Sequence, residues 1–317
     1  ESWCHGDCRW IEGECRDLQQ TPVHSAYKSL LEEYPFQSAK TDRGELVNII
    51  FVRTPFRSRQ QEELYRKYQD EILFIGLSSF EDYPLPPVNP FSPQFPKDKY
   101  VGMFPGFLHM FRDPSVFPSH VKTILMSQSD FDLPDPGETM PKEYDFVFSG
   151  TDQDVQNDCV GWSSFAKNWS FVLQSLDVMC REYGLSGVLV ASKDKEGKKS
   201  CSIPESCKGK VLQTSFLEQT QFFTYVKQSR FAFLPQVHDA SPRAAAQALT
   251  LNTPVLMNWH ILGGWKYVNS KTGEFFHDMS DFRTSLERVM HGAKMGTYKP
   301  REYMLSNYGN EIAGAKL

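Results

Sequence analysis

Short runs of apolar residues alternate along this chain with longer stretches in which apolar residues recur at helical spacing. Short apolar runs bounded by turn residues are typical of buried strands, whereas a spacing of three to four residues predicts amphipathic helices. Strands that alternate with helices predict an α/β protein with parallel sheets. The predicted strands span residues 46–52, 72–76, 122–127, 144–148, 187–191, 211–215, 231–234 and 253–257, and the predicted helices span residues 25–33, 58–70, 162–183, 216–229, 279–291 and 302–312.

Interruptions of this pattern divide the chain into predicted domains. The proline-rich segment 133–142 separates two series of strands, so we place a boundary between two Rossmann-like domains there. The proline-dense segment 81–100 cannot form a regular helix or a central strand, and it is either a binding loop or a solvated connection. The predicted domains are residues 1–44, a Cys-containing extension; residues 45–140, an N-terminal Rossmann-like domain; residues 141–300, a C-terminal Rossmann-like domain; and residues 301–317, a C-terminal helix.

Residues 230–268 are predicted to form a strand, a polar corner, a short alanine-rich helix and a second strand. Ser241 is a preferred N-cap residue, and Pro242 suits the first helical position because its missing N–H would have no partner there. The free N–H groups and the positive dipole at such a helix start bind phosphate. Arg243 adds donors that match phosphate oxygens, and Asp239 can accept hydrogen bonds from sugar hydroxyls.

A structural interpretation of the same residues is equally well supported by the local sequence. The helix is then simply buried, and Arg243 caps a neighbouring carbonyl group or pairs with Asp239. Gln247 follows Arg243 by one turn and shares its helical face, where its amide can hydrogen-bond a ribose hydroxyl without adding charge.

The stretch resembles the nucleotide-sugar motif of glycosyltransferases with the GT-B fold, especially the retaining family 4. That motif has two acidic residues eight positions apart, followed by a Pro-Val strand and a Gly-Gly turn. Asp239 and Gln247 fall on the two acidic positions, and residues 253–255 and 263–264 fall on the strand and the turn. Residues 272–276 resemble a later Thr-Gly-apolar segment. The sequence departs from the motif at two positions, because Asp replaces the first Glu and neutral Gln replaces the second.

The resemblance implies a GT-B protein with a nucleotide-sugar site in its second domain. It also implies that the helix 302–312 packs back on the first domain. The basic pair that the family carries after the first strand of the second domain is absent, and Lys193 or Lys195 either replaces it or is a solvated surface residue. Arg243 would be the main cation on the leaving diphosphate, and Asp239 would orient the sugar. The implied donor-binding residues are Gly150, Thr151, Lys193, Ser241, Pro242, Arg243, Gln247, Gly263 and Gly264.

The first domain is expected to bind the acceptor. Arg53 and Thr54 follow a predicted strand at the end where α/β sheets bind ligands. His109 and Asp130 are candidate catalytic residues for the proton of the acceptor hydroxyl, although a His beside aromatic residues is more often structural. Asp130 and Asp132 imitate the metal-binding Asp-x-Asp motif of another glycosyltransferase fold, but the order of elements fits GT-B, and we predict no metal and no cofactor.

Composition and charge restrict the function classes. The chain has 317 residues, 40% of them hydrophobic, and a formal net charge of −5, which gives no reason to expect nucleic acid as a partner. No apolar run approaches the length of a membrane span. Because the sequence starts at Glu1 rather than Met, we expect it to have been either processed or trimmed. A signal peptide or an anchor is a segment that can be removed in this way.

Seven cysteines indicate an oxidising compartment. Three of them, at positions 4, 8 and 15, form an N-terminal cluster that we interpret as disulfide-bonded, with a zinc site that includes His5 as the alternative. Cys201 and Cys207 bracket a small loop and are predicted to form a second disulfide, which leaves a free thiol at Cys159 or Cys180. Asn168 begins a glycosylation sequon. We therefore expect the lumen of the ER or Golgi, or secretion.

The sequence thus predicts a metal-independent glycosyltransferase. It would move a hexose or pentose from a UDP- or GDP-sugar to a hydroxyl group of a glycan or glycoprotein. Two alternatives stay open: an inverting enzyme similar to exostosins or fucosyltransferases, and a protein that binds a sugar or nucleotide without catalysis. The neutral Gln247 and the missing basic pair favour the second alternative.

Overall fold

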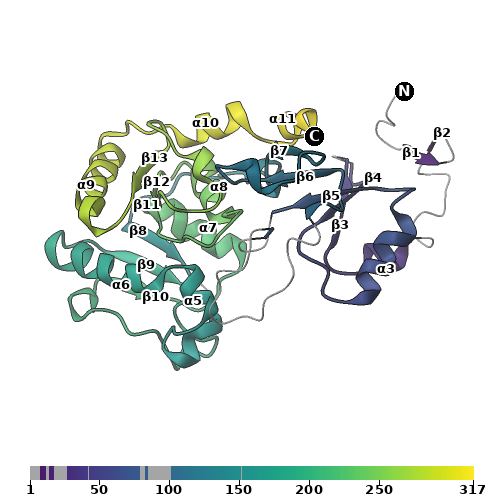
Figure 1. Ribbon diagram of the computed structural model, residues 1–317. Helices are drawn as coiled ribbons and strands as arrows, with labels where there is room; N and C mark the ends of the chain where they lie inside the picture. Colours follow the sequence, from purple (N-terminus) through teal and green to yellow (C-terminus); the bar gives the residue numbers. More distant parts are fainter. Residues whose placement is uncertain are drawn as a thin grey trace. The chain divides into compact units, whose positions relative to one another are not determined.

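The computed structural model describes residues 8–11, 14–17, 27–41, 43–78, 83–84, 101–150 and 152–317 (Figure 1). The chain forms two compact units, and the division falls after Ser127. The proline-rich segment in which we placed the boundary, residues 133–142, therefore lies inside the second unit. The reason is local, because the turn η3 (Gln128–Asp130) is tied to the second unit through Asp130.

The first unit contains a five-stranded sheet with the order β3-β4-β5-β6-β7. The strand β3 is antiparallel to β4, and all other neighbours are parallel. Ser58 caps α3 by accepting a hydrogen bond from the Gln61 N–H. The bounds are α2 (Lys28–Leu31), β3 (Phe36–Lys40), β4 (Leu46–Val52), α3 (Arg59–Tyr68), β5 (Leu73–Leu77), β6 (Gly106–His109), η2 (Pro114–Val116) and β7 (Lys122–Leu125), preceded by an antiparallel pair, β1 (Cys8–Ile11) and β2 (Glu14–Asp17).

The second unit is built on six parallel strands in the order β10-β9-β8-β11-β12-β13. This is the strand order of a Rossmann fold, in which the direction of strand addition across the sheet reverses between the first and the fourth strand. Here those strands are β8 and β11, so their carboxyl ends form the switch point at which ligands bind in such sheets. The strands are β8 (Tyr144–Ser149), β9 (Gly187–Val190), β10 (Val211–Gln213), β11 (Ser229–Leu234), β12 (Val255–Asn258) and β13 (Gly273–Phe276).

Helices cover both faces of this sheet (Figure 1). On one face α6 and α9 meet, where Phe171 stacks on Phe276 and touches Phe282 edge-on. On the other face α7, α8 and α10 pack together. The second-unit helices are η4 (Asp152–Asn157), α5 (Trp162–Ala166), α6 (Trp169–Asp177), the π-helical turn η5 (Val178–Glu182), η6 (Glu205–Cys207), α7 (Gln219–Gln228), α8 (Arg243–Thr250), η7 (Trp265–Tyr267), α9 (Met279–Met295), α10 (Pro300–Asn307) and α11 (Asn310–Lys316).

One predicted helix is interrupted. The segment 162–183 does not form a continuous helix, because Asn168 adopts a left-handed backbone conformation (φ 57°) between α5 and α6. The side chain of Asn168 donates a hydrogen bond to the Pro235 carbonyl at 3.0 Å, which ties the break to the end of β11. The sequon at Asn168 therefore lies on a half-buried side chain that is already hydrogen-bonded.

The terminal helices belong to the second unit. The Gly309 N–H donates to the Asp130 carbonyl at 2.8 Å, and the Tyr308 ring packs edge-on against Tyr267 at 5.0 Å between centroids. Asp130 also accepts hydrogen bonds from Lys266 and Tyr267. The implied packing of the C-terminal helix on the first domain stays a prediction, because these contacts lie within the second unit.

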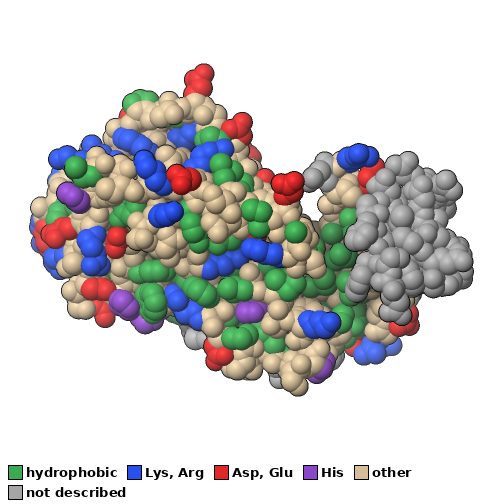
Figure 2. Space-filling model, turned by 90° about the horizontal axis from the view of Figure 1, so that it is seen from above, with side chains coloured by type: hydrophobic (Ala, Val, Ile, Leu, Met, Phe, Trp, Pro, Cys, Tyr) green, Lys and Arg blue, Asp and Glu red, His purple; other side chains and the backbone are tan. Residues whose placement is uncertain are grey.

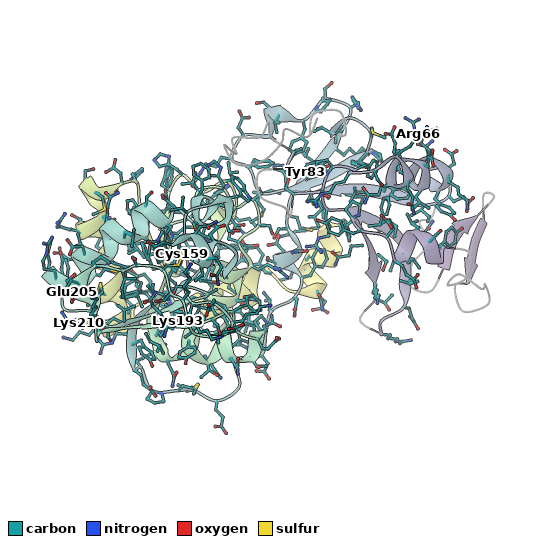
Figure 3. All side chains as sticks on the ribbon, turned by 90° about the horizontal axis from the view of Figure 1, so that it is seen from below. Arg66, Tyr83, Cys159, Lys193, Glu205 and Lys210 are labelled. Carbon is teal, nitrogen blue, oxygen red and sulfur yellow. A yellow bond between two sulfur atoms is a disulfide. The ribbon has the colours of Figure 1, made fainter. Side chains whose placement is uncertain are left out.

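Two disulfides staple the second unit, but not with the predicted pairing. Cys159 is bonded to Cys201, and Cys180 to Cys207 (Figure 3 labels Cys159). The pairing of Cys201 with Cys207 was therefore wrong, and neither Cys159 nor Cys180 is a free thiol. The tertiary fold brings the two bracketing cysteines against separate partners, Cys159 in the loop before α5 and Cys180 in η5. The side chains of Cys4, His5, Cys8 and Cys15 lie outside the described residues, so that cluster stays a prediction.

Basic and acidic side chains are interspersed on the face shown in Figure 2. Such mixing of both signs gives no large single-sign field over the described residues of that face. Within the described part of the chain, no helix combines the length and the apolar character that a membrane span requires.

Candidate functional site

The candidate site lies at the carboxyl ends of β8 and β11, the switch point of the second-unit sheet. The loop after β11 carries Asp239 and leads into α8. Its backbone is held by the turn after β12, because the Leu262 N–H donates to the Val237 carbonyl and the Gly263 N–H donates to the Asp239 carbonyl, each at 3.0 Å. The fold therefore brings the predicted polar corner and the predicted Gly-Gly turn together.

The start of α8 differs from the prediction in its cap. Pro242 occupies the N-cap position and Arg243 is the first helical residue, and no side chain caps the helix. Ser241 was expected to cap it, but the Ser241 hydroxyl is buried and has no hydrogen-bond partner among the described residues. The predicted N-cap was wrong by one residue, because Pro242 has a non-helical ψ of 89° and the helix begins at Arg243. The first-turn N–H groups of α8 are left without a side-chain acceptor.

The Asp239 side chain links its own loop to the connection between β8 and β9, which carries Lys167. One carboxylate oxygen accepts a hydrogen bond from the Ser241 N–H at 3.2 Å, and the other lies 3.2 Å from Lys167 Nζ. Both members of this ion pair are about one-quarter to one-fifth exposed at the side chain, so solvent reaches them. The structure thus places a cation beside Asp239.

Lys167 is the functional candidate that sequence reasoning missed. The sequence pattern predicts no basic residue at a turn after the first strand of the second domain, because it places Lys167 inside a continuous helix. The break at Asn168 instead turns Lys167 toward Asp239. The signal that could have found it is the Asn directly after the Lys, since Asn tolerates the left-handed conformation that ends a helix.

Arg243 and Gln247 lie on the exposed side of α8. Arg243 is exposed and makes no hydrogen bond or ion pair with another described residue, and Gln247 is half-buried. The alternative in which Arg243 pairs with Asp239 is therefore not what the structure shows, since Lys167 occupies that place. A free guanidinium beside uncapped amides can bind an anion.

The glycine turn is packed tightly against the start of α8. Gly264 has a φ of +76°, and a Cβ placed there would lie 2.3 Å from Pro242 Cγ. Only glycine fits both the backbone conformation and this contact. Gly263 and Gly264 therefore fix the position of the α8 start rather than supply functional groups.

A second buried polar group lies between β11 and the Asp239 loop. The Gln236 side chain is only 1% exposed, and its carbonyl oxygen has no hydrogen-bond partner among the described residues. Buried amide oxygens normally accept a hydrogen bond, and an exception indicates a site that a water molecule or a ligand completes. The unpartnered atoms of Gln236 and Ser241 thus flank Asp239 on both sides in sequence.

The remaining predicted donor residues lie at the same edge of the sheet. Gly150 directly follows β8, and its N–H donates to the Val190 carbonyl at 3.0 Å. Lys193 follows β9 and is half-buried. Thr151 lies outside the described residues, so its predicted role stays a prediction.

The predicted residues of the first unit are held in local structure. Thr54 is fully buried and donates to the Pro55 carbonyl at 3.1 Å, and Arg53 is half-buried at the end of β4. His109 is 4% exposed, and its Nδ1 accepts a hydrogen bond from the Phe111 N–H at 3.2 Å. Its ring packs against Phe117 at 4.9 Å between centroids. These contacts match the structural interpretation of His109.

Asp130 belongs to the second unit rather than the predicted acceptor domain. Its two oxygens lie 2.5 Å from Lys266 Nζ and 2.5 Å from the Tyr267 hydroxyl. Burial lowers the pKa of Lys266, and the neighbouring Asp130 carboxylate opposes that shift. Asp130 is therefore engaged in a buried ion pair, and the described residues contain no group of side chains arranged to hold a metal ion.

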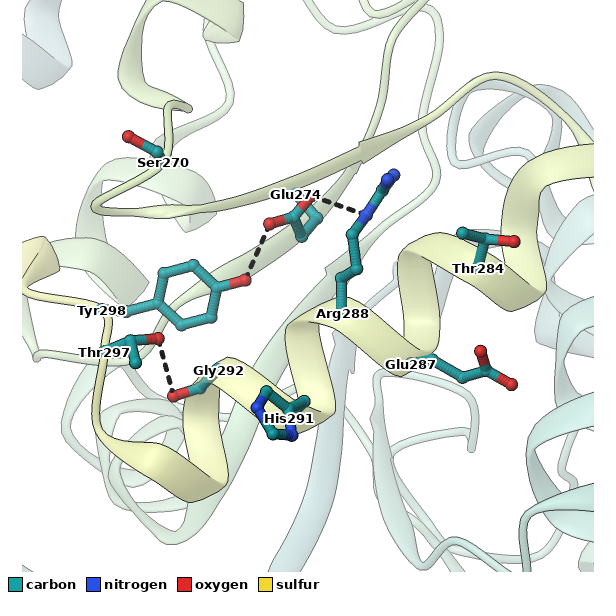
Figure 4. A pocket seen from close by; sticks show the side chains of 9 residues that line it. All are labelled: Ser270, Glu274, Thr284, Glu287, Arg288, His291, Gly292, Thr297 and Tyr298. Carbon is teal, nitrogen blue, oxygen red and sulfur yellow. Dashed lines mark hydrogen bonds and ion pairs between the residues drawn. The ribbon is translucent and has the colours of Figure 1, made fainter.

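A polar pocket of about 460 Å³ lies between β13 and α9 (Figure 4). Glu274 in its wall accepts a hydrogen bond from the Tyr298 hydroxyl at 2.9 Å and pairs with Arg288 at 3.2 Å. Burial raises the pKa of the Tyr298 phenol, and the bond to Glu274 raises it further. Glu274 and Arg288 in this pocket thus satisfy one another, and none of the predicted site residues lines it.

The structure is similar to solved glycosyltransferases of the GT-B fold, so the predicted fold class is confirmed. TarM superposes with a TM-score of 0.56 at 10% identity, over 77% of this chain and 49% of TarM. Sucrose-phosphate synthase from Thermosynechococcus elongatus gives 0.57 at 10% identity, over 92% of this chain and 75% of that protein. The pneumococcal O-GlcNAc transferase GtfA, solved in complex with UDP and GlcNAc, gives 0.54 at 10% identity, over 98% and 60%.

This chain therefore spans about half the length of TarM. At such low identity the similarity establishes the fold alone. No protein-family model matches the sequence, and no curated protein matches it significantly.

Proposed function

We propose that this GT-B protein transfers a sugar from a UDP- or GDP-sugar to a hydroxyl group of a glycan or glycoprotein. One observation carries the proposal: the uncapped start of α8 lies at the switch point beside the Lys167–Asp239 pair. Free amides, a free guanidinium and an ammonium group then surround one place where a diphosphate can bind. The solved complex of GtfA with UDP and GlcNAc supports a nucleotide sugar as the donor class.

The reaction needs charge stabilisation on the leaving group. Negative charge grows on the diphosphate as the glycosidic bond breaks, and groups fixed in advance around it lower the barrier. The helix start supplies about half an elementary positive charge together with its N–H donors. Arg243 and Lys167 each supply a full positive charge. In this proposal the Lys167 ammonium group exchanges its Asp239 partner for a phosphate oxygen and stays in the site. Asp239 is then released to accept hydrogen bonds from the sugar hydroxyls.

The same arrangement requires no metal ion in this proposal, since three kinds of protein cation or dipole converge on the diphosphate. The two disulfides of the second unit support an oxidising compartment such as the secretory lumen or the extracellular space. Whether the product keeps or inverts the anomeric configuration follows from NMR of the transferred sugar.

The proposal is tested by nucleotide binding with matched variants. In wild type, UDP or GDP at one hundred times its dissociation constant stabilises the fold by about 2.7 kcal/mol, measured as a thermal shift. Arg243→Ala and Lys167→Ala each remove a charged hydrogen bond of about 1.5–3 kcal/mol, so affinity falls about tenfold to a hundredfold. Arg181→Ala is the control, because Arg181 is an exposed arginine of η5 that forms an ion pair with Asp177.

Two outcomes would contradict this assignment. If no nucleoside diphosphate stabilises the wild type, the anion site is wrong. If the nucleotide binds and its binding depends on Arg243 and Lys167, but no donor is hydrolysed or transferred, the protein is a nucleotide-sugar-binding protein. That second function is favoured by the neutral Gln247 at the position where the resembling family has an acidic residue.

A further inference from the structure

A pocket of about 610 Å³ lies in the second unit beside the candidate donor site. Its volume falls within the range of about 300–1,000 Å³ that is typical of small-molecule sites. Its walls come from the loop before α5, α5 itself, the start of α6, the loop after β11 and the residue after Cys201. Residues that line it include Val160, Phe165, Asn168, Trp169, Ser202 and His238.

The pocket is continuous in sequence with the Lys167–Asp239 pair on two sides. Lys167 forms the ion pair, and the next residue, Asn168, lines the pocket. Likewise Asp239 forms the pair, and the preceding residue, His238, lines the pocket. The pocket therefore shares two stretches of backbone with the ion pair whose carboxylate orients the donor sugar in our proposal.

An aromatic side chain forms one wall of the pocket. Phe165 is 37% exposed, and its ring stacks on His238 with 4.9 Å between centroids and 20° between planes. The Trp162 ring packs against the Phe165 ring, with 5.6 Å between the centroids. Ser164 and Ser202 add polar groups around this apolar surface. A flat apolar surface with a few polar groups suits a sugar ring, which has apolar C–H faces and polar hydroxyl edges.

Backbone strain is concentrated around the same pocket. Five non-glycine residues in the described part of the chain have a left-handed φ, and three of them line the pocket: Asp158 (φ 53°), Cys159 (φ 58°) and Asn168 (φ 57°). Such strain persists only where surrounding structure enforces it, and it clusters at ligand sites. Here the Cys159–Cys201 disulfide and a 2.7 Å hydrogen bond from the Ser202 N–H to Asp158 enforce it.

We infer that this pocket binds a sugar ring of a glycan, and that this glycan is the acceptor, which replaces the acceptor site expected at Arg53 and Thr54. Three observations support a carbohydrate as the ligand. They are the Phe165 ring in the pocket wall, the polar groups of Ser164 and Ser202, and the left-handed backbone at residues that line the pocket. The assignment of this glycan as the acceptor rests on the proposed function, because it requires the donor to lie beside Asp239. The sugar of the donor has the same chemistry, so the experiment separates the two sources.

The test is oligosaccharide binding to the full chain, measured by calorimetry with chitotetraose, cellotetraose and maltotetraose. We expect at least one of them to bind wild type, and Phe165→Ala to weaken its binding about tenfold, the size typical of removing an anchoring aromatic ring. Leu305→Ala is the control and leaves affinity unchanged, because Leu305 is 50% exposed on α10 and does not line the pocket. Val160→Lys, at a residue that is 66% exposed, is a second variant that obstructs the pocket without truncating its wall.

UDP and UDP-sugar binding to the same variants separates the possible results. The inference is supported if Phe165→Ala and Val160→Lys weaken the oligosaccharide and leave the affinities for UDP and UDP-sugar unchanged. It is overturned if no oligosaccharide binds, or if neither variant weakens it. If the variants weaken UDP-sugar relative to UDP, the pocket holds the donor sugar and the acceptor assignment is overturned. If UDP fails to bind wild type while oligosaccharide binding depends on Phe165, the proposed function fails but the carbohydrate pocket stands.

Discussion

Gly264 offers a sharp test of how the donor site is held in place. Alanine at this position must adopt a φ of +76° and must place its Cβ 2.3 Å from Pro242 Cγ and 2.9 Å from Pro242 Cδ. Carbon atoms do not approach so closely, so either the glycine turn or the start of α8 must move. Pro242 is the N-cap residue of α8, and a shift there displaces the amides that we assign to the diphosphate.

The two costs can be separated with a second glycine. Gly209 has nearly the same backbone angle, a φ of +78°, but nothing lies within 4 Å of a Cβ built there. Gly209→Ala therefore measures the left-handed backbone cost alone, about 1–2 kcal/mol. Overpacking adds about 1–3 kcal/mol. We expect Gly264→Ala to lower the free energy of unfolding by about 2–5 kcal/mol, and Gly209→Ala by about 1–2 kcal/mol.

The assay is urea unfolding of both variants, followed by UDP and GDP titration at a temperature where both remain folded. We expect Gly264→Ala to lose nucleotide affinity as well as stability, and Gly209→Ala to keep the wild-type affinity. Equal losses of stability in the two variants would show that Pro242 is not fixed by the turn. Unchanged nucleotide affinity in Gly264→Ala would refute the role of the α8 start in holding the diphosphate.

Two further predictions concern the scaffold around the site. Replacing Cys180 and Cys207 together by alanine opens a loop with a sequence separation of 27, and the chain-entropy model predicts that the free energy of unfolding falls by about 3.5 kcal/mol. Urea unfolding of the variant and of the oxidised wild type measures this difference. A fall of less than about 1 kcal/mol would contradict the model. Hydrogen bonds from the Ser280 side chain and N–H lower the pKa of Asp278, the N-cap residue of α9, below its ordinary value of 3.8. The stabilisation by the Asp278 charge is therefore present above pH 3.8 and is lost as the pH falls through the lower pKa of the folded state. We expect the difference in urea midpoint between wild type and Asp278→Asn to become smaller in acid. A difference that stays constant from pH 7 to pH 2 would show that this carboxylate does not cause the pH dependence.

The sequence pattern predicted the fold class because burial in a parallel sheet leaves a strong signal. Strands such as β8 and β11 are buried on both faces, so they read as short continuous apolar runs. The strand–corner–helix–strand unit around α8 was visible for the same reason. The exact start of α8 was not, because the choice between Ser241 and Pro242 as N-cap depends on how Gly264 packs against the proline.

Long-range pairing was decided by the tertiary structure. Cys201 and Cys207 are close in sequence, and local spacing favoured a bond between them. The fold instead places each against a cysteine that is 42 or 27 residues away, because α6 and η5 pack over the loop that carries both. A sequence pattern contains no record of which segments meet across a sheet.

By itself, the order of apolar and polar residues predicted two α/β units and a helix that starts after one strand of the second unit, where we propose that an anion binds. Local propensity and periodicity are short-range properties, so they could be read directly from the chain. The partner of Asp239, the pocket beside it and the strained backbone at Asn168 were decided only when two distant connections met at the ends of β8 and β11. Those features depend on the crossing of segments some 70 residues apart, since Lys167 and Asp239 are separated by 72 positions, and packing of the whole unit is what holds them together.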